Sequence, residues 1–361
     1  MIIPWLDWAS LAIRWLHLAA GIAWIGTSFY FIWLERSLRA RENLPKGVQG
    51  ESWSVHGGGF YHVQKYAVAP EAMPDDLHWF KYEAYFTWLS GFALLIVLYY
   101  FGASTYLIDS TRADLTPTMA IGISVAFLIG SWGLYEALCR SPIGRSTTVL
   151  ASSVLVLILV SAFLLTQIFS DRAAFLHVGA LIGAIMSANV FVVIIPHQKK
   201  VVADLLDKKR PDPSLGAQAR QRSLHNNYLT LPVLLLMVSA HYPLLFSGGA
   251  AWGWLVVGVI IVIGAIVRHF FNTHHTGGRG LQLMWQWPLA IILGLGLIFF
   301  IASKNELRFT GQVSDNQAFN IVEQHCVSCH AVHPSNPTFK TAPAGVVLGS
   351  LASVREHRTR M

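Results

Sequence analysis

Long apolar runs alternate with short polar segments along most of this 361-residue chain. A helix needs about 20 apolar residues to cross the hydrocarbon core of a bilayer, and eight runs reach that length. They are residues 8–34, 80–108, 116–138, 147–169, 173–196, 226–247, 250–270 and 281–302. The pattern therefore predicts an all-α fold, an eight-span transmembrane helical bundle.

The pattern changes after the eighth run, where Lys304 and Arg308 belong to a polar stretch. We therefore predict two domains, a membrane domain over residues 1–302 and a small soluble tail over residues 303–361. The composition agrees with a membrane class, because 54% of the residues are hydrophobic and only 12% are charged. The first run has neither the basic start nor the cleavage site of a signal peptide, so we expect it to be a retained span.

Basic residues in the connections predict the topology. The connections after the first and fifth spans hold five and seven Lys and Arg residues, whereas those after the second and fourth hold one each and that after the sixth none. Basic connections face the cytoplasm, so both termini are expected outside, with the chain in the bacterial inner membrane and its tail in the periplasm. These connections explain the net charge of +7. We therefore expect membrane lipid as a partner and no nucleic acid.

The tail contains the motif Cys326-Val-Ser-Cys329-His330. C-x-x-C-H is the attachment signature of c-type haem, in which the thiols add to the haem vinyl groups and the imidazole binds the iron. No second C-x-x-C is present to complete a zinc site, and Cys139 is the only other cysteine. We predict haem c bound covalently at Cys326 and Cys329, with His330 as the metal ligand.

The tail is short for a cytochrome c domain, and we predict a truncated one. A distal Met usually binds the second face of the haem, and the only Met after His330 is Met361. His333 is too near His330 in the chain to reach that face, and His357 is a nominal alternative. So short a module rarely builds its own core.

Three histidines lie in the predicted periplasmic half of the spans, and imidazoles inside a membrane are functional candidates. His17 shares a helix face with Gly21, which leaves room beside the ring for a flat macrocycle. His177 lies on a stripe of small residues that includes Gly179. We predict one b-type haem with His17 and His177 as its axial metal ligands and His241 as a further cofactor-binding candidate. The alternative is that these groups serve only helix packing.

A second polar cluster lies on the predicted cytoplasmic side. The long first connection alternates around Gly57-Gly58-Gly59, which predicts a β-hairpin. Polar and aromatic side chains follow at the ends of several spans: His78, Lys81, Glu83, His225, Asn227, Arg268, Trp285 and Gln286. They predict a pocket with an arginine for an anion, amides for polar edges and aromatic rings for stacking. The alternatives are an interfacial belt or a second haem b held by a pair such as His225 and His269.

Four segments resemble a known family. They are His17-Leu-Ala-Ala-Gly-Ile-Ala-Trp-Ile-Gly26, His56-Gly-Gly-Gly-Phe-Tyr-His62, His78-Trp-Phe-Lys-Tyr-Glu-Ala-Tyr85 and His225-Asn-Asn-Tyr-Leu-Thr-Leu-Pro232. With the C-x-x-C-H tail, the chain is similar to the membrane-bound, cytochrome c-linked urate oxidases (urate hydroxylases) of bacterial purine catabolism. The resemblance implies conversion of urate and water to 5-hydroxyisourate, with electrons passing through haem to the respiratory chain.

With urate as the substrate, we predict roles for the polar cluster. Urate would be held by the substrate-binding residues Arg268, Lys81, Asn227, Gln286 and Trp285. Glu83, His78 or His225 would accept a proton while water attacks C5, for which a group with a pKa near neutrality is best suited. The electrons would leave to a soluble cytochrome c or a terminal oxidase.

Two other function classes stay open at this point. A haem-containing oxidoreductase that uses a quinol or a porphyrinogen would share the first-span pattern, and a quinol predicts an apolar, membrane-facing pocket instead of a polar one. A purine transporter with an appended cytochrome is the other class. Transporters usually show paired broken helices and internal repeats, which this sequence does not show clearly.

Overall fold

The computed structural model describes residues 5–70, 72–306, 314–336 and 339–357. The chain divides into two compact units, Met1–Ile301 and Ala302–Met361, and each is described by itself. Met361, the candidate distal ligand, lies outside the described residues.

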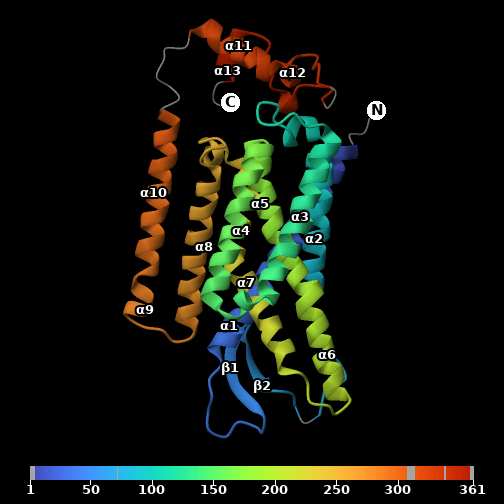
Figure 1. Ribbon diagram of the computed structural model, residues 1–361, viewed down its shortest axis with the longest axis vertical. Coiled ribbons are helices and arrows are strands. Elements are labelled where there is room, and N and C mark those ends of the chain that lie inside the picture. Colours follow the sequence, from blue (N-terminus) through green and yellow to red (C-terminus); the bar gives the residue numbers. More distant parts are fainter. Residues whose placement is uncertain (1–4, 71, 307–313, 337–338, 358–361) are drawn as a thin grey trace. The chain divides into compact units, whose positions relative to one another are not determined.

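The first unit is a bundle whose long helices run along a common direction (Figure 1). The long helices are α1 (Trp5–Ser37), α2 (Tyr82–Leu95), α3 (Pro117–Arg140), α4 (Thr147–Ile168), α5 (Asp171–Ala188), α6 (Ile195–Leu206), α7 (Pro213–Val238), α8 (Gly253–His275) and α10 (Gln286–Glu306). Shorter turns extend or join them: the π-helical η1 (Ile96–Tyr100), η2 (Ala103–Leu107) and η4 (Asn189–Ile194), the 3₁₀-helical η3 (Pro142–Arg145), η5 (Ser239–His241) and η6 (Pro243–Phe246), and α9 (Leu281–Met284).

Seven of the described helical segments are long and apolar enough to cross a membrane, which is compatible with a multi-pass membrane protein. They are Trp5–Ser37, Tyr82–Tyr100, Pro117–Arg140, Thr147–Ile168, Asp171–Leu206, Gly253–His275 and Leu281–Lys304. Each overlaps a predicted span. The predicted span 226–247 is not among them, because α7 begins upstream in polar sequence and ends at Val238, where short 3₁₀ turns follow. The eighth span stays a prediction.

The predicted β-hairpin is confirmed: β1 (Val48–His56) pairs antiparallel with β2 (Gly59–Tyr66). Gly57 and Gly58 form its two-residue turn with φ values of +58° and +81°, in the left-handed region that favours glycine because it has no Cβ. Across the strands His62 hydrogen-bonds Glu51 at 2.7 Å. This bond lowers the pKa of the Glu51 carboxyl group.

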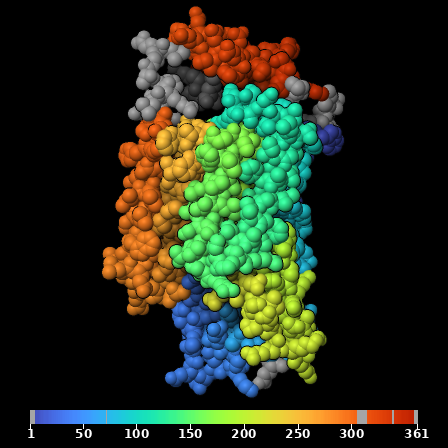
Figure 2. Space-filling model, in the orientation of Figure 1, coloured from blue at the N-terminus to red at the C-terminus, as the bar shows by residue number. Residues whose placement is uncertain are grey.

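The hairpin and the connection between α6 and α7 project from the same end of the bundle (Figure 2). Glu35 at the end of α1 forms ion pairs with Lys65 of the hairpin and, at 3.7 Å, with Arg220 of α7. The first and fifth predicted connections therefore lie on one side, as their basic residues indicated. The assignment of that side to the cytoplasm stays a prediction.

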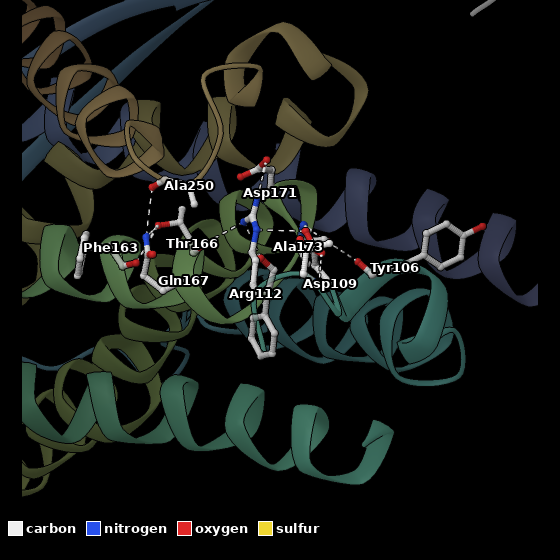
Figure 3. A network of polar contacts seen from close by, with 12 residues as sticks. Tyr106, Asp109, Arg112, Phe163, Thr166, Gln167, Asp171, Ala173 and Ala250 are labelled. Carbon is white, nitrogen blue, oxygen red and sulfur yellow. Dashed lines mark hydrogen bonds and ion pairs between the residues drawn. The ribbon is translucent and has the colours of Figure 1, made fainter. Parts of the chain in front are cut away.

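At the other end of the bundle, Arg112 holds together three segments (Figure 3). Its guanidinium donates to the carbonyl oxygens of Thr166 and Phe169, both at 2.8 Å. It also forms ion pairs with Asp109 at 3.1 Å and with Asp171 at 2.8 Å. Because the two carbonyls belong to the end of α4 and Asp171 to the first turn of α5, Arg112 ties the α2–α3 connection to the α4–α5 turn.

The second unit is a small helical module. It contains α11 (Asp315–His325), α12 (Val327–His330), η7 (Pro343–Gly345) and α13 (Leu351–Glu356). Ser314 and Gln317 form a reciprocal capping box at the start of α11. Val322, Val346 and Leu348 are its buried apolar side chains. The tail thus has a core of its own, although a small one.

Candidate functional site

A single stretch of α7 carries several buried polar side chains. Arg222, Asn226 and Asn227 are at most 6% exposed, and His225 lies between them. At helical spacing Arg222, His225 and Asn226 share one face, whereas Asn227 is turned away by about 100°. Two hydrogen-bond networks therefore start from the same turn, one toward α3 and η4 and the other toward α8.

The first network leads from η4 to His225. Asn189 donates from Nδ2 to the Tyr135 hydroxyl oxygen at 3.1 Å and to Asn226 Oδ1 at 2.9 Å. The Tyr135 hydroxyl lies 2.7 Å from His225 Nδ1. Because Asn189 already donates to this hydroxyl oxygen, we assign the tyrosine O–H as the donor to His225, which places the proton of a neutral imidazole on Nε2.

A buried ion pair adjoins this network. Arg222, 2% exposed, contacts Glu136 at 2.8 Å, and its guanidinium lies 5.3 Å from the centre of the Tyr135 ring. Burial and the nearby Arg222 charge lower the pKa of His225 to about 4. His225 is therefore neutral at pH 7 and is arranged as a hydrogen-bond donor through Nε2, which does not favour its predicted role as a proton acceptor.

The second network joins α7, α8 and α1. Asn272 donates from Nδ2 to Asn227 Oδ1 at 2.8 Å, and Arg36 of α1 donates to the Asn272 carbonyl oxygen at 3.3 Å. Arg268 lies one helical turn before Asn272 and is 5% exposed. Its guanidinium lies 4.1 Å from the centre of the Phe29 ring of α1. Asn227, a predicted substrate-binding residue, is thus bonded to Asn272, which lies one helical turn from Arg268, another predicted substrate-binding residue.

Five buried atoms of the two networks have no hydrogen-bond partner within the described residues. Three belong to donors, Arg222 Nε, Arg268 Nε and Asn227 Nδ2, and two are acceptors, Asn189 Oδ1 and Asn272 Oδ1. A buried polar group without a partner is costly, so such atoms in a native protein are usually satisfied by water or a ligand. We call these five residues the polar layer. The atoms of the second network, Arg268 Nε, Asn227 Nδ2 and Asn272 Oδ1, suit a ligand that carries both N–H and C=O groups.

Trp285 and Gln286 lie where α10 begins. Gln286 is fully buried and donates to the Gln282 carbonyl oxygen at 2.6 Å. Trp285 is 46% exposed, with its ring 5.9 Å from that of His269. The described contacts link neither residue directly to the polar layer, so their substrate-binding roles stay predictions.

The predicted haem pair His225 and His269 lies on two different networks. His225 is bonded to Tyr135 of α3, as described above, whereas His269 is bonded through Nδ1 to the Tyr228 hydroxyl at 2.9 Å. The geometry therefore does not favour a second haem between them.

His78 and Glu83 lie elsewhere, in a groove of about 370 Å³ between α1 and the start of α2. The groove is lined by Leu16, Ala20, Ala23, His78, Trp79, Tyr82, Glu83 and Phe86. It shares no residue with the polar layer. Lys81 does not line the groove, and its ammonium group lies 4.8 Å from the centre of the Tyr82 ring. The polar cluster predicted from the sequence is thus divided between the groove and the networks around α7.

The surroundings of His177 do not fit an axial haem ligand. His177 is 1% exposed and donates from Nδ1 to the Ala173 carbonyl oxygen at 2.7 Å. Nε2, the atom that iron would need, lies 2.7 Å from Ser124 Oγ. The Phe169 ring centre is 5.1 Å from the imidazole, and a Cβ on nearby Gly179 would lie 3.1 Å from the Leu236 side chain. The small-residue stripe therefore serves helix packing.

His17 is packed against α2. Its Nδ1 lies 3.0 Å from the Thr87 carbonyl oxygen and 3.2 Å from Ser90 Oγ. A Cβ on Gly91 would lie 2.8 Å from the imidazole Cε1 atom, so α2 fills the space on this side of the ring. His241 lies on η5 with its side chain exposed. A haem b held by these histidines stays a prediction that the geometry does not favour.

The C-x-x-C-H motif of the tail has a geometry that fits its predicted group. His330 donates from Nδ1 to the Val346 carbonyl oxygen at 2.8 Å, and the Leu348 amide donates to the His330 carbonyl oxygen at 2.7 Å. A proton on Nδ1 leaves Nε2 free to bind a metal, as in most metal-ligating histidines. Cys326 and Cys329 are half-buried free thiols, and burial raises the pKa of Cys326.

Sequence reasoning missed Tyr135, Asn189 and Asn272. Asn189 is a lone amide in an otherwise apolar run, and Asn272 is four residues from Arg268, so both carried a signal. Tyr135 and Arg222 can be recognised as part of the first network only in the folded chain, where α3 contacts α7.

Comparison with protein families matched residues 4–302 to the family described as urate oxidase N-terminal. The comparisons with curated proteins and with solved structures found no match.

Proposed function

Because the chain belongs to the urate oxidase N-terminal family, which suggests an oxidoreductase with urate as substrate, we propose that it is a membrane urate oxidase. The reaction is the conversion of urate and water to 5-hydroxyisourate. The seven apolar helices and the basic connections on one side support a place in the bacterial inner membrane. The observation that carries the proposal for the site is the polar layer with its unpartnered atoms.

Urate is a planar anion at neutral pH, with ring N–H groups that donate and carbonyl groups that accept hydrogen bonds. In the proposal Arg268 binds the anionic edge, because a guanidinium forms strong charge-assisted bonds to such oxygens. Asn227 Nδ2 donates to a ring carbonyl and Asn272 Oδ1 accepts from a ring N–H. The Phe29 ring under Arg268 fixes the plane of the guanidinium.

The oxidation joins a water oxygen to C5 of urate and releases two electrons and two protons. His225 and Asn189 belong to the first network, on another face of α7, so we assign them no contact with urate. Glu83 and His78, the predicted proton acceptors, line the separate groove, so we assign them no contact with urate in the polar layer.

Electrons leave through the tail. Haem c bound covalently to Cys326 and Cys329 would supply a one-electron iron couple. The chain's own contribution is the His330 imidazole, which the Val346 carbonyl holds in the tautomer that can bind iron. We propose a soluble cytochrome c or a terminal oxidase as the acceptor, on the periplasmic side. No step is assigned to haem b, since the site around His177 does not fit it.

The test compares two arginine variants in the purified full-length chain. Arg268→Gln removes a charged bond to the substrate and is expected to lower kcat/KM for urate by about 100-fold, the effect of losing roughly 2–3 kcal/mol. The matched control is Arg220→Gln, because Arg220 is 81% exposed and pairs only loosely with Glu35. Its activity should equal that of the wild type.

A second variant keeps the proposal testable if Arg268→Gln fails to fold. Asn227→Asp retains the oxygen that accepts from Asn272 and places a negative charge against the anion, so KM for urate should rise by more than about tenfold. Normal urate kinetics in both variants, at an unchanged unfolding temperature, would exclude the polar layer as the urate site.

A further inference from the structure

The groove between α1 and α2 has the features of a binding site that the proposed urate chemistry does not use. It is lined by the small residues Ala20 and Ala23 of α1 and by the aromatic residues Trp79 and Phe86. Leu16 is 49% exposed and Phe86 is 51% exposed, so the groove opens on the apolar outer surface of the bundle. In a bilayer this surface faces lipid.

Two proton-carrying side chains lie at one end of this apolar groove. His78 and Glu83 belong to the segment where α2 begins, whereas Leu16 and Phe86 continue the groove along the two helices. Within the described residues neither the His78 nor the Glu83 side chain makes a hydrogen bond, and His78 contacts only the Phe80 ring, at 4.6 Å. An imidazole and a carboxyl group are thus available to a ligand.

We propose that the groove binds an isoprenoid quinone, which accepts electrons from urate oxidation as a second acceptor beside haem c. Such a molecule has an apolar tail for the Ala20 and Leu16 end and a flat head that stacks on Trp79 or Tyr82. A carbonyl oxygen of this head suits the His78 N–H as a hydrogen-bond donor, and Glu83 lines the same groove as a second proton-carrying group. A phospholipid fits less well, because its phosphate would meet the Glu83 carboxylate and because Lys81 is directed to Tyr82 instead of the groove.

The inference rests on the proposed urate oxidation as the source of electrons. Urate, water and quinone give 5-hydroxyisourate and quinol: two electrons and two protons leave urate and water, and each quinone oxygen gains one of each. Glu83 and His78 pass the protons to those oxygens. Helix α1 borders both places, since Phe29 contacts Arg268 and Trp24 packs in the cluster that contains the groove residue Trp79.

The first experiment measures binding without urate. Decylubiquinone is titrated into the detergent-purified full chain by calorimetry. Ala20→Trp places a large side chain at a residue that lines the groove and should weaken binding by at least about tenfold. The matched control is Ala19→Trp, because Ala19 is the exposed neighbour on α1 that does not line the groove; it should bind like the wild type.

Three outcomes would overturn the site: no binding by the wild type, equal binding by Ala20→Trp, or displacement of decylubiquinone by phosphatidylglycerol. The last would make the groove a phospholipid site. Because no urate is present, none of these outcomes depends on the proposed urate oxidation.

The second experiment adds urate and decylubiquinone without oxygen and measures quinol. The wild type should form one quinol per urate consumed. Ala20→Trp should lose quinol formation while urate still reduces haem c. If decylubiquinone binds but is not reduced while haem c is, the acceptor role is wrong. If urate reduces neither haem c nor decylubiquinone, the proposed function is wrong. The binding experiment alone then decides whether the groove binds a quinone.

Discussion

At the scale of single residues, polar side chains of similar type around α7 differ in whether their hydrogen-bonding atoms have partners. Asn227 and Arg268 keep unpartnered donor atoms, whereas Asn226 is satisfied by Asn189 and by the Met186 carbonyl oxygen. The sequence predicted Arg268 and Asn227 as part of a polar pocket, and in the structure both are buried. The sequence could not show that Gln286, whose Oε1 atom is also unpartnered, lies outside the two networks of α7, because that depends on contacts between helices.

The low pKa of His225 leads to a prediction of how stability depends on pH. Its pKa is about 4 in the folded chain against an ordinary 6.5, so below pH 6.5 the unfolded chain binds a proton that the folded chain does not. Stability should therefore fall as the pH decreases from 6.5 to about 4, by roughly 2–3 kcal/mol from this residue. Thermal unfolding across this window measures the effect.

His225→Gln removes the titrating group and should reduce the slope of unfolding temperature against pH in that window. An identical slope in the variant and the wild type would contradict the assignment of a depressed pKa to His225.

At the scale of elements, helix length and hydropathy predicted most of the bundle but not α7. Seven of the predicted spans overlap apolar helices, since burial in lipid demands continuous apolar sequence. Helix α7 mixes polar and apolar residues because it contacts α3, α5 and α8 through Arg222, Asn226 and Asn227. The hairpin was predictable because its glycine turn and alternation are local signals.

The crossing of α7 and α8 depends on Gly264. A Cβ at this position would lie 2.6 Å from Pro232 Cδ and 3.1 Å from Pro232 N, and the proline ring cannot rotate away. Gly264→Ala is therefore expected to lower stability by about 1–3 kcal/mol through overpacking, although alanine is the better helix former.

The matched control for Gly264 is Gly130 of α3, where an added Cβ meets nothing within 4 Å. Gly130→Ala should leave the unfolding temperature unchanged or raise it slightly. If the two variants unfold at the same temperature, the stability does not depend on the close contact between α7 and α8 at Gly264.

At the scale of the whole molecule, the chain joins a large helical unit to a small one that carries C-x-x-C-H. The motif was recognisable from five consecutive residues, whereas the hydrogen bond from His330 to Val346 joins residues 16 apart and follows only from the fold of the tail. The proposed haem b could not be judged from sequence, because the packing around His177 involves α3 and α7.

Haem attachment to the tail is tested by Cys329→Ser. The variant should lose most of the haem that stays bound to the denatured chain, since one of the two thioether bonds cannot form. The matched control is Cys139→Ser, which changes a thiol of the first unit and should retain the haem. Equal haem staining of both variants on a denaturing gel would contradict covalent attachment at this motif.

The central claim is that urate delivers electrons to this chain. Its most direct test is the reduced-minus-oxidised absorption spectrum of the purified full-length protein after urate is added without oxygen. We predict the α band of a reduced c-type haem, and Arg268→Gln should delay its appearance. A haem c that dithionite reduces but urate leaves oxidised would contradict the account.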